Sequence, residues 1–175
     1  MRGLLKKYVV SLALATAPLL IAGSAWADPP APALRLLNSL SIPVSALNPG
    51  TGTFSFDISF VDQSTGVYYL ADRNNFAVDV VSAESIVTQI FPNNGFTGFA
   101  GFTACSPPAG ANDCAGPNGV VAAFPWLFVT DAPSRVLSFD LRQNPPLTVG
   151  ECTTRAGEPT RADELAYDPK DGLIL

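Results

Sequence analysis

The sequence predicts an all-β protein that repeats one four-stranded antiparallel unit. The first observation is the stretch over residues 54–90, where short runs of β-branched and aromatic residues alternate with turn-forming clusters. Such runs are typical of antiparallel strands joined by tight turns. The clusters lie at 63–66, 72–75 and 82–85, so they divide the stretch into four strands. We interpret it as one blade of a β-propeller.

The second observation is that the same order of strands recurs. Residues 118–121, 126–131 and 135–140 repeat a strand, an aromatic strand that ends in Asp and a third strand that ends in Asp. Another copy begins at residue 163 and matches residues 57–67 without a gap. A closed propeller needs at least four blades. The predicted fold is therefore an incomplete β-propeller, with two four-stranded antiparallel blades and the start of a third.

Residues 1–27 have the three parts of a secretory signal peptide. A basic start precedes an apolar stretch over residues 8–22, and small residues end the segment before Asp28. Because spanning a membrane takes roughly 20 apolar residues, we favour cleavage before Asp28 over a membrane anchor. We expect a periplasmic or secreted protein with no stable membrane insertion after cleavage.

Charge and composition restrict the partners of the mature chain. Without the signal peptide, seven Lys and Arg face fifteen Asp and Glu, a net charge of about −8. Nucleic acids and anionic membranes require basic clusters, so we expect no nucleic-acid partner. The chain contains no His, which leaves carboxylates, amides, hydroxyls or a metal ion for any chemistry.

The mature chain divides into an N-terminal connector and the repeats. Residues 28–50 begin with a Pro-rich spacer and continue into a segment that is similar to the strand at 87–92. We expect that segment to form either a strand that latches the ring or, from its leucine spacing, an amphipathic helix. The partial propeller covers 51–175, with blade one at about 54–92, an insertion with two cysteines at 93–117, blade two at about 118–153 and the third blade begun at 161–175.

The third copy stops inside its second strand. Its last residues, 173–175, are apolar and lack most of the sheet neighbours that a full blade would supply. An open strand edge favours pairing with another chain. We therefore expect a truncated copy of a longer propeller that is prone to edge-to-edge self-association, and a truncated product without function of its own remains an alternative.

Three cysteines in an exported chain indicate an oxidising compartment. Cys105 and Cys114 flank a short Pro- and Gly-rich loop, which favours a local disulfide bond between them. Closing such a small loop is worth on the order of 2–3 kcal/mol. Cys152 is left without an assigned partner.

The first blade resembles a known type of repeat. Residues 67–72, followed by the strand at 78–81, look like the YVTN-type repeat of bacterial secreted propellers, a group that includes NHL-repeat proteins. A weaker resemblance links the Gly-Pro-Asn-Gly segment at 116–119 to the gluconolactonase (regucalcin-like) propellers. Proteins of these kinds include lyases and lactonases, and many of them only bind.

The gluconolactonase resemblance implies a site for a divalent cation such as calcium. In that frame Asn118 and Asp163 stand where the family places ligands, and Asp57 stands where it uses Glu. The resemblance implies that a metal-bound water opens a sugar lactone, and oxygen ligands suit a hard cation. A structural interpretation is open as well, because the three residues share one repeated position where small polar side chains cap turns.

Two functions are thus compatible with the sequence. The leading interpretation is a non-catalytic, exported propeller that binds a small ligand or a protein through one face of the ring. The alternative is a metal-dependent, lactonase-type hydrolase built on Asp57, Asn118 and Asp163.

Overall fold

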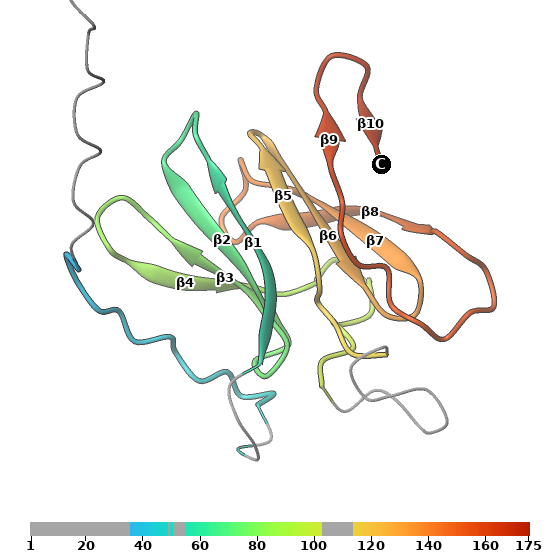
Figure 1. The fold of residues 1–175 in the computed structure, drawn as a ribbon, viewed down its shortest axis with the longest axis horizontal. Helices are drawn as coiled ribbons and strands as arrows, with labels where there is room; N and C mark the ends of the chain where they lie inside the picture. Colours follow the sequence, from blue (N-terminus) through green and yellow to red (C-terminus); the bar gives the residue numbers. More distant parts are fainter. Residues whose placement is uncertain (1–35, 49, 51–54, 103–113) are drawn as a thin grey trace, which may run out of the picture. The chain divides into compact units, whose positions relative to one another are not determined.

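The computed structural model describes residues 36–48, 50, 55–102 and 114–175. In these ranges the chain forms ten strands and no helix, so the predicted all-β class is confirmed (Figure 1). None of the described segments is therefore a helix that could cross a membrane. The signal peptide and Cys105 lie outside the described residues. The chain divides into two units, 1–37 and 38–175, and the second is the subject below.

The first sheet is a four-stranded antiparallel meander. Its strands are β1 (Phe56–Asp62), β2 (Val67–Asp72), β3 (Ala77–Val81) and β4 (Val87–Ile90), and they pair in chain order. The tight turn between β1 and β2 ends at Gly66, whose φ of +70° favours glycine. The four antiparallel strands predicted for this stretch are confirmed.

The second sheet repeats this arrangement. It consists of β5 (Val120–Ala123), β6 (Trp126–Asp131), β7 (Arg135–Asp140) and β8 (Leu147–Thr153), again antiparallel and in chain order. A separate hairpin follows, formed by β9 (Tyr167–Asp168) and β10 (Leu173–Ile174). The prediction of two four-stranded antiparallel sheets and a further pair of strands is confirmed.

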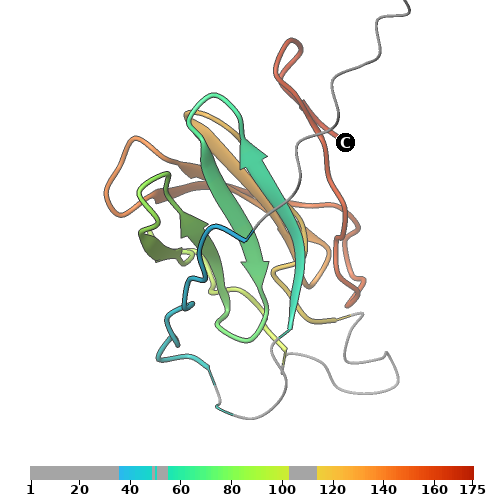
Figure 2. The same cartoon turned by 60° about the vertical axis from the view of Figure 1, so that its left-hand side comes forward.

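The core lies between the two sheets, where alternate side chains of each sheet meet. Sheet one contributes Tyr69, Val78 and Ile90, and sheet two contributes mainly Leu127 and Phe139, all buried. Burying a side chain of this size stabilises the fold by about 1.5–3 kcal/mol. The first strands of the two sheets, β1 and β5, lie side by side (Figures 1 and 2).

The N-terminal segment of this unit binds sheet one through side chains. Residues 38–45 form neither the strand nor the helix considered for them. Instead, the carbonyl of Pro43 accepts hydrogen bonds from Asn75 Nδ2 (3.1 Å) and Gln89 Nε2 (2.9 Å). Ser45 donates its backbone N–H to Asn75 Oδ1 (3.0 Å) and its hydroxyl to the Asn75 carbonyl (2.7 Å). Side-chain contacts hold this segment, and it forms no backbone ladder with a strand.

Candidate functional site

One end of the two sheets carries Asp72, Asp131 and the ion pairs described below, and we call it the polar end. It is where β2 ends at Asp72 and β6 ends at Asp131. The segments that enter β1 and β5 lie at the same end, since the backbone N–H of Ile58 donates to the carbonyl of Asn118 (2.9 Å). The repeated position predicted from the sequence therefore belongs to the polar end in both sheets.

The three predicted ligand residues converge there, with two arginines between them. Arg73 forms an ion pair with Asp57 and donates its Nε–H to Asn118 Oδ1 at 3.1 Å. Arg161 contacts Asp163 at 2.9 Å and Asp57 at 3.7 Å. We call these five residues the arginine cluster.

Asn118 joins the cluster to the segment that precedes β9. Its Nδ2 donates to the carbonyl of Ala162 at 3.0 Å, while its backbone N–H donates to the carbonyl of Thr130 at 2.9 Å. The next residue is Gly119, where a Cβ would overlap the Asp163 carbonyl and crowd the Thr130 hydroxyl. The close approach of these elements explains why glycine follows Asn118.

The arginine cluster does not fit a divalent cation. A carboxylate oxygen of Asp57 and the amide oxygen of Asn118, which a metal would need, already accept from guanidinium groups. Burial, followed by the positive charge of Arg161, lowers the pKa of Arg73, so two cations already lie close together in a poorly solvated place. Within the described ranges, no three His, Cys, Asp or Glu side chains gather to hold a metal.

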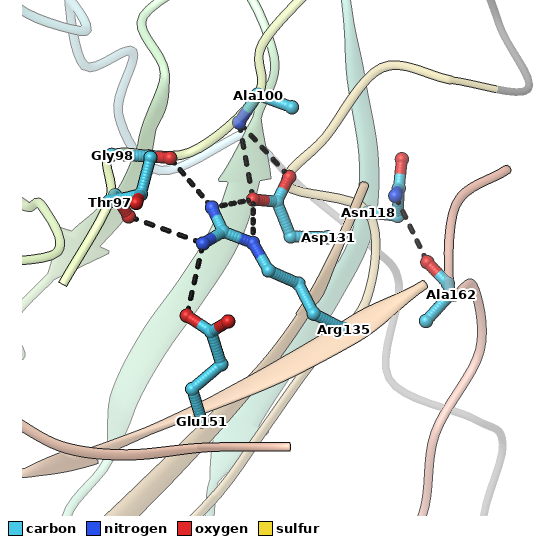
Figure 3. A network of polar contacts seen from close by, with 8 residues as sticks. All are labelled: Thr97, Gly98, Ala100, Asn118, Asp131, Arg135, Glu151 and Ala162. Atoms are coloured by element: carbon cyan, nitrogen blue, oxygen red, sulfur yellow. Dashed lines mark hydrogen bonds and ion pairs between the residues drawn. The ribbon is translucent and has the colours of Figure 1, made fainter. Parts of the chain in front are cut away.

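A second network surrounds Asp131 and Arg135 (Figure 3). Arg135 donates to Asp131 Oδ2 from Nε (3.0 Å) and Nη2 (2.5 Å), and to Glu151 Oε2 from Nη1 (3.1 Å). It also donates to the carbonyls of Gly98 (2.6 Å) and Thr97 (3.4 Å). This guanidinium therefore joins β6, β7 and β8 to the segment that connects the two sheets.

The Asp131 carboxylate is fully buried and closely surrounded. Burial raises its pKa to about 6, although the charge and hydrogen bonds of Arg135 act in the opposite direction. It also accepts from the backbone N–H of Ala100 at 3.1–3.2 Å. A Cβ at Gly116 would overlap Asp131 Oδ1. The prediction from the sequence placed Asp131 at the end of a strand and missed Arg135, four residues later, as its partner.

Sheet one contains a buried acid of a different kind. Asp79 is fully buried, its Oδ1 accepts from Gln89 Nε2 at 2.9 Å, and its Oδ2 has no hydrogen-bond partner in the described part of the chain. Burial raises the pKa of Asp79 to about 7; the hydrogen bond from Gln89 opposes this shift and the neighbouring Asp72 adds to it. Asp79 is therefore protonated in mildly acidic solution.

A cavity of about 720 Å³ opens beside the Asp131 network, and we call it the polar-end cavity. The Arg155 side chain is 77% exposed and that of Glu158 is 42% exposed, and they form a loose ion pair of 3.7 Å at its rim. The lining residues are Thr97, Gly98, Ala100, Ala132, Pro133, Arg135, Glu151, Thr153, Arg155, Ala156, Gly157, Glu158 and Pro159.

No protein-family model, curated protein sequence or solved structure matches this chain. The resemblance to YVTN- and NHL-type propellers thus stays a proposal that depends on the residues themselves. The Cys105–Cys114 disulfide also stays a prediction, while Cys152 is an exposed free thiol.

Proposed function

We propose that this chain is an exported β-propeller repeat protein that binds a small ligand or a protein at its polar end without catalysing a reaction. Two successive sheets with the same strand order, packed with their first strands side by side, support the propeller interpretation. Export depends on the signal peptide, and N-terminal sequencing of the mature protein should begin at Asp28. A mature protein that retains residues 1–27 would contradict export by this route.

The observation that carries the binding proposal is the polar-end cavity. Its volume of about 720 Å³ lies within the range of ligand pockets in proteins. The Asp131–Arg135 network holds one wall in place through five side-chain hydrogen bonds from Arg135. A preorganised wall reduces the entropy that binding costs.

The rim of this cavity favours a ligand that has both charges. Arg155 and Glu158 are exposed, and an ion pair of 3.7 Å between exposed groups contributes little to stability. Both side chains can therefore turn to a ligand at small cost. A short zwitterionic peptide has the matching groups.

The test is an NMR titration of the 15N-labelled chain with triglycine. The comparison peptide is triglycine with an acetylated N-terminus and an amidated C-terminus, which has no charge. We expect saturable chemical-shift changes around residues 132–135 and 153–159 with triglycine, and weaker changes with the uncharged peptide. Both sets of changes should be lost in an Arg155→Ala, Glu158→Ala double variant. Arg142→Ala is the matched control, because Arg142 is an exposed, ion-paired arginine that follows the opposite end of β7. Saturable binding that survives the double variant would contradict a site at the polar end, as would the absence of binding.

The metal-dependent hydrolase is the weaker candidate. Its ligand set, Asp57, Asn118 and Asp163, is engaged by Arg73 and Arg161. These arginines supply the positive charge that a cation would bring to the cluster.

A further inference from the structure

A second cavity, of about 320 Å³, lies at the end of the sheets opposite the polar end. Sheet one contributes residues of β2, β3 and β4, among them Tyr69, Val80 and Ile90. Sheet two contributes the β5–β6 turn with Phe124 and the segment after β7 with Leu141. We call it the inter-sheet cavity.

Hydrogen bonds hold the two sides of this cavity together. On one side, Asn93 Nδ2 donates to the carbonyl of Pro146 (2.8 Å), and the backbone N–H of Thr148 donates to Asn93 Oδ1 (2.9 Å). On the other side, the backbone N–H of Phe124 donates to Asp62 Oδ2 (3.3 Å). Hydrogen bonds between side chains and backbone groups far apart in the sequence therefore join the two sides of the cavity.

The Tyr69 hydroxyl indicates that this cavity binds a ligand. The residue is only 4% exposed, yet its hydroxyl makes no hydrogen bond with any residue that the structure describes. The hydroxyl oxygen is not fully enclosed by protein atoms, and Tyr69 lines the inter-sheet cavity. The hydroxyl therefore opens onto this cavity. Burial and the charge of Asp62 raise the pKa of Tyr69 to about 12, which keeps the hydroxyl neutral and able to donate. A buried Tyr hydroxyl normally finds a partner.

The lining also restricts the chemistry of the occupant. None of the residues that line the inter-sheet cavity carries a charge. Apolar walls with a few hydroxyl and amide groups are typical of sites for small, uncharged, partly apolar molecules. A charged molecule would lose its hydration here without gaining an ion pair.

We propose that the inter-sheet cavity binds an uncharged ring compound that accepts a hydrogen bond from the Tyr69 hydroxyl. This site is independent of the polar-end cavity and goes beyond the function proposed above. The apolar walls would enclose the ring, and Tyr69 would fix its orientation.

Three small compounds of similar size test the proposal in NMR titrations of the full, 15N-labelled chain. Acetophenone has a ring and a neutral acceptor, benzoate has the same ring with a charge, and toluene has the ring alone. We expect saturable shifts near Tyr69, Val80 and Leu141 with acetophenone, and at least tenfold weaker binding of benzoate. The Tyr69→Phe variant should bind acetophenone about three- to tenfold more weakly and toluene as the wild type does.

Tyr68→Phe is the matched control, because Tyr68 neighbours Tyr69 in β2 and points to the other face of the sheet. It should leave all three titrations unchanged. A second variant, Val80→Phe, fills the cavity and should abolish binding while a cooperative melt shows that the fold is intact. The proposal is overturned if acetophenone gives no saturable shifts, if benzoate binds equally well, or if Tyr68→Phe weakens binding as much as Tyr69→Phe.

Discussion

The Asp at the same repeated position has different partners in the two four-stranded sheets. In sheet one, Asp72 ends β2 and caps its turn, accepting from the backbone N–H groups of Asn74 (2.9 Å) and Asn75 (3.1 Å) and from the Asn75 amide (2.6 Å). In sheet two, Asp131 ends β6 and pairs with Arg135 at 2.5 Å. The sequence position is the same, and the partners are amides in one sheet and a guanidinium in the other.

This difference decides how each sheet responds to a change of charge. In sheet one, the only charged neighbour that shifts the pKa of Asp79 among the described residues is the like-charged Asp72. In sheet two, an arginine within the same network balances the buried Asp131. The comparison therefore predicts that sheet one is more sensitive to pH than sheet two, and that sheet two is sensitive to loss of its arginine.

The largest expected effect follows from Arg135→Ala. This change leaves the buried Asp131 without its partner, and removing one member of a buried ion pair costs about 3–5 kcal/mol. Urea denaturation should show the loss. Arg142→Ala, which breaks an ion pair at an exposed arginine, serves as control and should cost much less. Equal losses in the two variants would break the comparison.

The next effect is a fall in stability as the pH rises. The folded-state pKa of Asp79 is raised to about 7 from an ordinary value of 3.8, so the folded chain holds a proton that the unfolded chain has released between these values. The contribution of Asp79 to the free energy of unfolding is therefore fully present below about pH 4 and is lost as the pH rises to about 7, by at most about 4 kcal/mol.

An Asp79→Asn variant should remove most of this decline. Asp131, with its pKa raised to about 6, contributes a smaller decline in the same direction, which Asp79→Asn leaves in place. Denaturation curves from pH 4.5 to 8 measure both contributions. A wild-type stability that rises over this range would contradict the assignment of Asp79 as a buried, protonated acid.

A smaller effect is expected at Gly116. Its added methyl group would overlap the Asp131 carboxylate, and forcing a group into a packed site costs about 1–3 kcal/mol. Gly98 is a matched control, because a Cβ there meets nothing within 4 Å. Thermal melts of Gly116→Ala and Gly98→Ala should therefore differ clearly. If both variants have the melting temperature of the wild type, sheet two is packed less closely around Asp131 than described.

The strands were predictable because their signals are local. Alternating apolar residues and turn clusters within residues 54–90 define β1 to β4, and the same pattern defines β5 to β8. The N-terminal connector was not predictable, since the amides of Asn75 and Gln89 that hold Pro43 come from distant parts of the chain.

For the candidate site, the repeated sequence position indicates residues that lie near one another and does not indicate the arginines between them. Asp57, Asn118 and Asp163 lie at one end of the sheets. The arginines were missed because Arg73 and Arg161 approach Asp57 from segments that only folding brings together. For Arg135, the spacing of four residues across a tight turn was a signal that the sequence did contain.

The most direct test of the central claim, that arginines take the place of a metal ion in the cluster, is a calorimetric titration of Ca²⁺ into the full chain. Asp163→Ala serves as the comparison, since Asp163 is a partly exposed member of the cluster. We predict no saturable heat in either protein and the same melting temperature with and without the ion. Saturable binding of one Ca²⁺ that is lost in Asp163→Ala would contradict this claim and restore the metal site.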